Sequence, residues 1–251
     1  MHTLGVDLSA RPRRTAAVVV DWSAERAVVR TPLLRCGDEQ LLHLLTALGA
    51  ADRAGVDCPF GWPAAFVEAM SAHAGRSPRW PGRDAEGDDD LRALRYRRTD
   101  LFAARHAPRP PLSVSFDKLG AVAARWARLQ ALLAGRGRPV DRGGAGRIAE
   151  VYPAAARHQW GLPLGTVDEL TAAAPWLEVP DEARRVCAAS RDAYDALVCA
   201  LVARAVGLRL TTAPGPEDAE AARVEGWIHI PAPGTLERLR PAGRAGAGPP
   251  G

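Results

Sequence analysis

Two short apolar runs of the chain each end in an aspartate, and both carry the same three letters, GVD. The first run covers residues 3–8 with Asp7 near its end, and the second covers residues 53–58 with Asp57 in the matching place. A carboxylate at the end of a buried strand is costly unless a cation or hydrogen-bond donors compensate its charge. The repeat therefore predicts two strands whose aspartates share one compensating partner.

The segment between the two runs predicts how their strands are arranged. Residues 15–21 and 26–31 are rich in valine and are separated by a short polar turn, which is typical of a hairpin. Residues 38–48 begin with acidic side chains and continue with leucines at helical spacing, which predicts a helix. A helical crossover between two strands of one sheet makes them parallel. If the first strand is central, we expect Asp7 and Asp57 to lie in register.

The rest of the chain alternates between apolar segments and loops. We expect a helix over residues 63–74, a partly helical segment over 91–107, an amphipathic helix over 118–134, a strand over 148–152, a short helix over 167–174, one long helix over 181–206 and an edge strand over 226–231, with loops at 77–90 and 135–147. From residue 232 the composition turns to Pro, Gly, Ala and Arg without an apolar pattern, which predicts disorder. The domain is therefore expected to cover residues 1–231, with an insertion at about 75–135 and a disordered tail at 232–251.

Composition excludes several classes of protein. No stretch reaches the ~18 apolar residues of a membrane span, and the first residues lack the basic and apolar regions of a signal peptide, so we expect a cytoplasmic protein without membrane contact. The four cysteines form no CxxC pair and the six histidines no HxxxH pattern, so zinc is not indicated. The net charge of +4 suits a polyanionic partner. Lys118 is the single lysine among 33 basic residues, however, and GC-rich codon usage also accounts for so many arginines.

Two further aspartates lie in the late helix. Asp192 and Asp195 are three residues apart, share a helix face and precede the apolar segment 196–202. If that helix packs at the same end of the sheet as Asp7 and Asp57, the four carboxylates cannot all ionise without cations. Oxygen ligands favour Mg²⁺ or Mn²⁺, and two such ions can hydrolyse a phosphodiester. The alternative is structural: Asp192 caps the helix or pairs with neighbouring Arg191, and Asp195 pairs with a local arginine.

Five motifs in this order carry a resemblance to a known family: GVDLS at 5–9, GVDCPFGWP at 55–63, RRTD at 97–100, EVYP at 150–153 and DAYDAL at 192–197. The chain resembles ribonuclease H-like nucleases, is most similar to the predicted-nuclease family called domain of unknown function 429, and has a final helix similar to that of bacterial Holliday-junction resolvases. The resemblance covers roughly residues 3–231. It implies an α/β fold with a mixed five-stranded sheet, in which a hairpin joins parallel strands, with helices on both faces and helical insertions.

The resemblance also implies roles for the acids. Asp7 would bridge the metal ions, Asp192 and Asp195 would be late-helix ligands, and Asp57 would take the fourth-strand position, where resolvases usually carry glutamate. Glu150, on the last core strand, is a fifth candidate ligand. Its alternative role is an ion pair with nearby Arg147.

A second set of residues is a candidate for substrate contact. Ser9 could donate to a phosphate, and its alternative role is to cap the turn after the first strand. The RRTD segment could also contact phosphate, with its acid orienting an arginine. Its alternative is a solvated helix face with local ion pairs. The segment consists of Arg97, Arg98, Thr99 and Asp100.

Three functions follow from this reading. The first is a metal-dependent nuclease that uses Mg²⁺ or Mn²⁺ to hydrolyse DNA or RNA. The second is a member of the same fold that binds nucleic acid or protein without catalysis. The third is an actin-like kinase or ATPase, which also starts with an aspartate on its first strand. Such enzymes need glycine-rich turns for nucleotide phosphates, and the turn DLSARPRRT at 7–15 contains no glycine.

Overall fold

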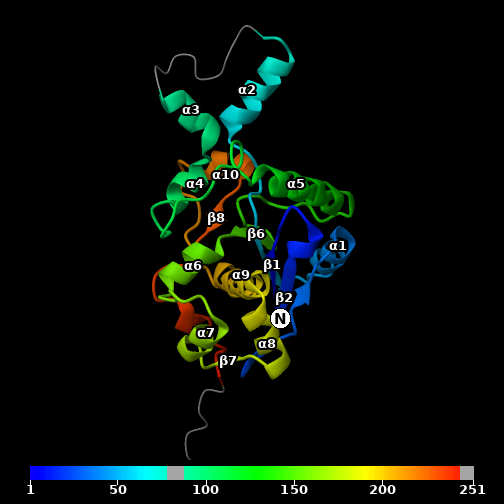
Figure 1. Ribbon diagram of the computed structural model, residues 1–251, viewed down its shortest axis with the longest axis vertical. Coiled ribbons are helices and arrows are strands. Elements are labelled where there is room, and N and C mark those ends of the chain that lie inside the picture. Colours follow the sequence, from blue (N-terminus) through cyan, green and yellow to red (C-terminus); the bar gives the residue numbers. More distant parts are fainter. Residues whose placement is uncertain (78–87, 244–251) are drawn as a thin grey trace, which may run out of the picture.

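One mixed β-sheet forms the centre of the molecule in the computed structural model, which describes residues 1–77 and 88–243 (Figure 1). Its strand order is β7-β3-β2-β1-β5-β6-β8, and β4 pairs with β2. The strands are β1 His2–Asp7, β2 Ala16–Trp22, β3 Ala27–Val29, β4 Leu33–Leu34, β5 Arg53–Asp57, β6 Ile148–Val151, β7 Leu177–Glu178 and β8 Ile228–His229.

The strand pairing agrees with the expected α/β arrangement. β1, β2 and β3 pair antiparallel in sequence, as a hairpin requires, and β5 and β6 continue the sheet in parallel on the other side of β1. The sheet has eight strands instead of five within the described part of the chain. The additional strands β4, β7 and β8 have two residues each and lengthen the sheet at its margins.

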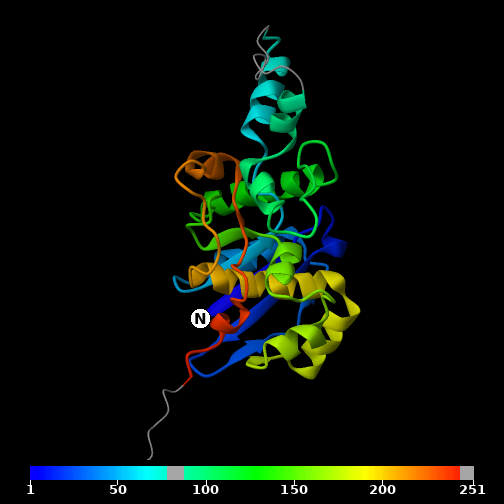
Figure 2. The ribbon, with the colours of Figure 1, turned by 90° about the vertical axis from the view of Figure 1, so that its left-hand side faces the viewer.

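Helices cover both faces of this sheet. They are α1 Asp38–Thr46, α2 Ala64–Ala74, α3 Asp88–Arg95, α4 Arg98–Ala103, α5 Gly120–Gly135, α6 Pro153–Gln159, α7 Val167–Ala173, α8 Asp181–Ala189, α9 Arg191–Gly207 and α10 Ala219–Glu225, with short 3-10 helices at Pro12–Arg14 and Leu236–Leu239. The leucines of α1 and α5 fill one core, and α9, with α6, α7 and α8 around it, fills the other. Figure 2 shows α9 lying across the sheet, while α2 and α3 form an arm that projects away from it. No helix in the described residues is long and apolar enough to cross a membrane.

The prediction of one long helix over residues 181–206 is wrong, because the helix is interrupted at Ser190. This residue is extended (φ −130°, ψ 116°), and its hydroxyl accepts a hydrogen bond from the amide of Ala193. It therefore ends α8 and caps the start of α9. The apolar pattern continues across the break, so periodicity alone did not reveal it. The break places the start of α9, with its two aspartates, at the edge of the sheet.

The segment 232–243, expected to be disordered, is packed against the core. Leu236 and Leu239 are buried among the residues around α9, and the hydroxyl of Thr235 accepts a hydrogen bond from the indole of Trp160 at 3.2 Å. These two leucines attach the segment to the core, although its overall composition predicted no packing. The rest of the expected tail, 244–251, and residues 78–87 of the expected loop lie outside the described residues.

Candidate active site

The two aspartates of the GVD repeat lie side by side at the carboxyl ends of β1 and β5. The strands pair in parallel with Asp7 opposite Asp57 and Gly5 opposite Gly55. Neighbouring strands are ~4.8 Å apart, and partners in register direct their side chains to the same face. The predicted register is confirmed, and it brings two half-buried carboxylates together at one end of the sheet.

The glycines of the repeat explain why the same letters occur twice. A Cβ atom on Gly5 would lie 1.9 Å from the carbonyl oxygen of Ala196, and one on Gly55 would lie 2.5 Å from the carbonyl oxygen of Cys199. Only a residue without a side chain allows two backbones to approach so closely. Helix α9 therefore packs directly on the backbones of β1 and β5, which brings its first turns to the aspartates of those strands.

The first two turns of α9 supply the other two acids of the site. Asp192 lies in the first turn, just after the Ser190 cap, and Asp195 follows on the same face. The positive end of the helix dipole favours an anion in the first turn. The side chains of Asp192 and Asp195 are 25% and 19% exposed, so both can be reached from solvent.

Burial and neighbouring carboxylates both raise the pKa values of the two strand aspartates. Burial, followed by the negative charges of Asp195 and Asp192, raises the pKa of Asp7 to about 8. Burial and the charges of Asp7 and Asp195 raise the pKa of Asp57 well above its ordinary value. The fold therefore favours the protonated forms of Asp7 and Asp57, because burial and the neighbouring acids make their ionisation costly. A bound cation would offset that cost.

Three arginines nevertheless contact the acids of α9. Arg157 of α6 donates to Asp195, and Arg191 donates from Nε to the other oxygen of Asp195 at 2.9 Å. Arg14 reaches Asp192 at 3.4 Å. The expected structural alternative thus holds for Asp195, while Asp192 pairs with Arg14 and not with Arg191. Across residues 1–77 and 88–243, no three His, Cys, Asp or Glu side chains are arranged to hold a metal ion.

Glu150 forms part of a buried ion network next to the site. It lies one strand beyond Asp57, on β6, as expected. Its Oε1 accepts a bond from Nη2 of Arg97 at 2.7 Å, and its Oε2 accepts bonds from Nη1 of Arg97 and the amide of Phe60, both at 2.9 Å. The expected partner Arg147 instead donates to the carbonyl of Leu48. Both oxygens of Glu150 are thus engaged by protein donors.

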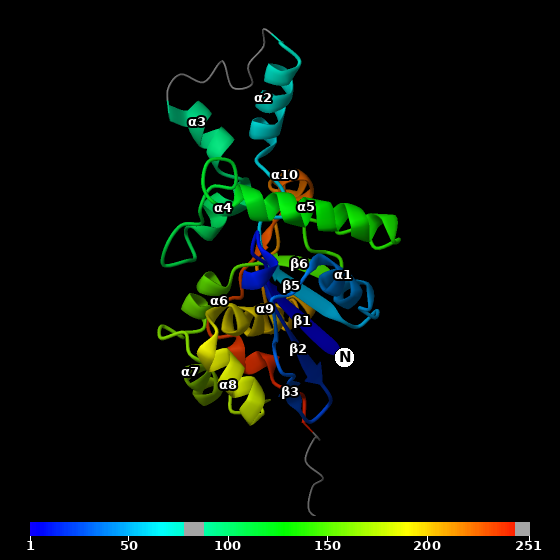
Figure 3. The ribbon, with the colours of Figure 1, turned by 45° about the vertical axis from the view of Figure 1, so that its right-hand side comes forward.

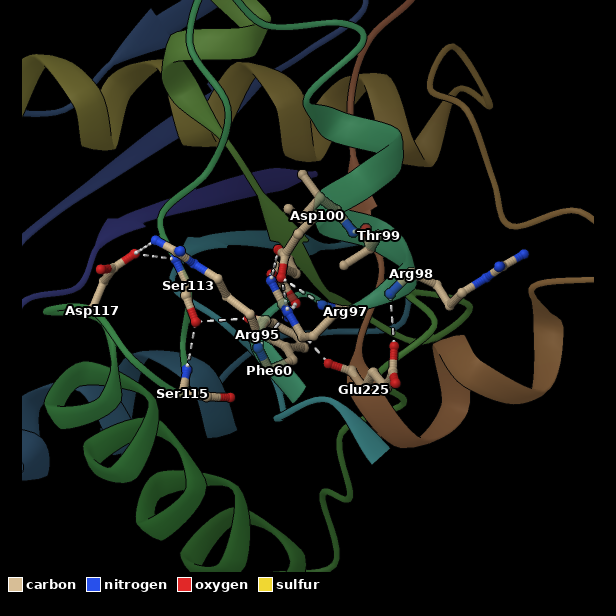
Figure 4. A network of polar contacts seen from close by, with 12 residues as sticks. Phe60, Arg95, Arg97, Arg98, Thr99, Asp100, Ser113, Ser115, Asp117 and Glu225 are labelled. Carbon is tan, nitrogen blue, oxygen red and sulfur yellow. Dashed lines mark hydrogen bonds and ion pairs between the residues drawn. The ribbon is translucent and has the colours of Figure 1, made fainter. Parts of the chain in front are cut away.

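The RRTD segment begins α4, and most of it is structural. Figure 4 shows Arg97 and Asp100 in the middle of a polar network, and their side chains are 2% and 1% exposed. All five N–H groups of Arg97 are used, since it also bonds to Asp100 and to the carbonyl of Glu225. The hydroxyl of buried Thr99 accepts a bond from the amide of Ile228. These three residues therefore have no surface to offer a phosphate, and the segment is not the solvated helix face of the alternative either.

Arg98 and Ser9, the other two candidates for substrate contact, also have partners within the protein. The exposed side chain of Arg98 pairs with Asp218 at 2.8 Å. The carbonyl of Ser9 accepts a bond from Arg125, and its hydroxyl accepts one from the amide of Arg11 at 3.5 Å. The capping role of Ser9 matches this geometry.

A cavity of about 300 Å³ opens beside Asp7 and Asp57. Its remaining walls come from the residue after β1, from the turn after β5, from the start of α4, from the chain between α4 and α5 together with the start of α5, and from the ends of β6 and β8. Much of the lining thus belongs to the segment between β5 and β6, where the sequence predicted an insertion. The cavity makes this end of the sheet a recess and not a flat edge.

Sequence reasoning missed the arginine of α6 and the residues that form this recess. A signal for Arg157 was present, because Pro153 directly after a strand is typical of the first residue of a helix, and α6 begins there. One helical turn later, Arg157 faces the aspartates. The pairing of Arg14 with Asp192 and the positions of the residues that line the cavity depend on tertiary packing, so no local pattern predicted them.

Comparison with known proteins gives a family without an assigned activity. Residues 5–220 match the family described as "Protein of unknown function (DUF429)". No curated protein and no solved structure matches the chain.

Proposed function

The chain belongs to the family of proteins of unknown function DUF429, and we propose that it is a metal-dependent nuclease with a ribonuclease H-like fold. The strand order supports this fold, since an aspartate strand, a hairpin, a helix and a parallel aspartate strand precede a late acidic helix. The main supporting observation is the register of Asp7 with Asp57, which face the two acids at the start of α9. Hydrolysis of a phosphodiester in DNA or RNA is the activity that this arrangement suits best.

The chemistry of the donor set suits a hard divalent cation such as Mg²⁺ or Mn²⁺, although no three of the described acids are arranged around one site in the structure. Carboxylate oxygens are the ligands these ions prefer, and a cation bound beside Asp7 and Asp57 would offset the burial and the repulsion that raise their pKa values. Asp7 and Asp57 would hold the cation, joined by Asp192 and Asp195. A cation held by these residues would neutralise their charge and would supply the activation of water and the stabilisation of the leaving oxygen that hydrolysis requires.

The arginines around the acids have a role in binding the substrate. A guanidinium pairs with phosphate through the same parallel N–H bonds that it forms with carboxylate. Arg157 and Arg191 also lie over the face of the Tyr194 ring, with guanidinium carbons 5.9 and 5.3 Å from its centroid, so their position is held from a second side. We assign Arg157 and Arg191 to the substrate phosphates, whose binding would release Asp195 from its ion pairs.

The same ion pairs favour a second candidate function. If Arg157 and Arg191 keep Asp195 permanently, the site is a neutralised surface, and the protein binds nucleic acid or another protein without catalysis. The partners of Asp192 and Asp195 in the structure are the observation in favour of this function. Titration of the purified protein with Mn²⁺ separates the two, because only the nuclease requires a bound cation.

An assay on several nucleic acids tests the proposal. We expect the protein to cut at least one of single-stranded, duplex, hybrid or branched DNA or RNA in Mg²⁺ or Mn²⁺, and Asp7→Asn to lower the rate at least about a hundredfold. Asp168→Asn is the matched control, since its side chain is 80% exposed and belongs to α7. Equal inactivity of wild type and Asp7→Asn on every substrate would refute the nuclease.

A further inference from the structure

We propose that the cavity beside Asp7 and Asp57 binds one unstacked nucleobase, so that the substrate is a single strand or an unpaired nucleotide and not a continuous duplex. The inference rests on the proposed nuclease function, because it names the part of the substrate that lies next to the phosphate. It is carried by the shape and the chemistry of the cavity, which the acids themselves do not explain.

Much of the lining of the cavity is apolar or aromatic. The walls are formed by Pro59, Pro111, Leu112, Leu119, Val122 and Tyr152. A volume of about 300 Å³ lies at the lower end of the range for small-molecule pockets. A space of this size suits one base and is too small for a base pair with its neighbours.

The polar residues in the lining do not compete for a ligand. Arg97, Asp100 and Glu150 reach the cavity, but their charged groups bond to one another. What remains for a ligand is an apolar recess with the carboxylates of Asp7 and Asp57 at one side. A nucleotide matches this combination, because its base has flat apolar faces and its phosphate lies where the acids would hold a cation.

The position of the walls disfavours a duplex. Leu112 lines the cavity from the segment between α4 and α5, and it is 52% exposed, so it lies at the mouth. Figure 3 shows α4 and α5 above the sheet in that view. A base in a duplex is stacked and paired, and it enters such a recess only after extrusion, which costs a few kcal/mol. An unpaired nucleotide enters without that cost.

Binding can be measured apart from hydrolysis in the Asp7→Asn protein. The probe is a fluorescein-labelled oligothymidylate of about 12 nucleotides, alone or annealed to oligodeoxyadenylate, and the readout is anisotropy. We expect the single strand to bind at least about tenfold more tightly than the duplex, and Leu112→Glu to weaken that binding about tenfold by placing a charge at the mouth. Leu208→Glu is the control, because Leu208 is 38% exposed and follows the far end of α9.

A second measurement tests the base itself. Thymidine monophosphate should compete with the labelled strand at least about tenfold better than ribose 5-phosphate, which carries the phosphate without a base. Equal binding of strand and duplex, or equal effects of Leu112→Glu and Leu208→Glu, would overturn the inference even if the wild type cuts nucleic acid. If the protein binds tightly in a base-dependent way but cuts no substrate, the base-binding subsite is supported and the proposed nuclease function is refuted.

Discussion

At the scale of single residues, the site combines acids that differ in how their charge is compensated. Asp7 and Asp57 are half-buried and repel the other acids, whereas Asp195 is held by two arginines and Glu150 by Arg97. The two kinds of acid therefore have opposite effects on the stability of the metal-free protein. Acids without a partner destabilise the metal-free protein, and the paired acids stabilise it, so substitutions at the two kinds of position should act in opposite directions.

Asp7→Asn should stabilise the metal-free protein in a pH-dependent way. The pKa of Asp7 is raised from 3.8 to about 8 in the fold, so between these values the folded state holds a proton that the unfolded state has lost. Stability of the wild type therefore falls as pH rises from about 4 to about 8. At pH 7 with a chelator, we expect Asp7→Asn to melt about 3–8 °C higher, since 1 kcal/mol shifts a chain of this size by about 2–4 °C. The melting temperatures are measured by circular dichroism. If the difference between Asp7→Asn and the wild type is the same at pH 4 and at pH 8, the titration of Asp7 is not its cause.

Arg97→Gln should strongly destabilise the folded protein. The substitution leaves the carboxylates of Asp100 and Glu150 buried without their cation, and breaking a buried pair in this way typically costs about 3–5 kcal/mol. Arg98→Gln is a matched control on the next residue, because its exposed pair with Asp218 contributes about 1 kcal/mol or less. Urea unfolding of both variants checks the prediction, and similar losses would show that the network is not what holds α4 in place.

At the scale of elements, the packing of α9 on the sheet was predictable and its starting point was not. The GVD repeat gave the parallel pair and its register, because a helical crossover and matching strand lengths leave few alternatives. The start of α9 depends on one hydroxyl, that of Ser190, within an apolar pattern that continues on both sides. Helix α6, and with it Arg157, was missed although Pro153 marks its first residue.

Gly5→Ala should separate α9 from the sheet. Its Cβ would lie 1.9 Å from the carbonyl oxygen of Ala196 and 2.3 Å from the amide nitrogen of Ala200, both in the backbone of α9. Overpacking against backbone cannot be relieved by a side-chain rotation, so we expect a loss of about 3 kcal/mol or more in urea unfolding. Gly135→Ala, at the end of α5, meets nothing within 4 Å and should be neutral or slightly stabilising. A tolerated Gly5→Ala would mean that the contact is looser than the structure shows.

At the scale of the whole molecule, sequence and tertiary structure contributed different parts of the site. The four aspartates and their common location could be predicted, since strand ends and a helix start converge at one edge of the sheet. Arg191, which holds Asp195, is a neighbour on α9, whereas Arg14 and Arg157 come from distant parts of the chain. Much of the cavity wall comes from the segment between β5 and β6. The i,i+4 pair of Arg191 with Asp195 could be predicted, whereas the distant partners follow from packing and leave no periodic signal. The same applies to Leu236 and Leu239, which attach the end of the described chain to the core.

Because the arginines and a cation compete for the same acids, metal binding should report on the whole assembly. At a Mn²⁺ concentration about 100-fold above its dissociation constant, the wild type should gain about 2.7 kcal/mol, which corresponds to about 5–10 °C in a thermal melt. Asp7→Asn should lose this gain. Arg157→Gln should bind Mn²⁺ more tightly than the wild type, because Asp195 loses a donor that competes with the cation for its carboxylate. If no variant responds to Mn²⁺ at millimolar concentration, the ion pairs are permanent, and the protein is the non-catalytic binding member of the fold.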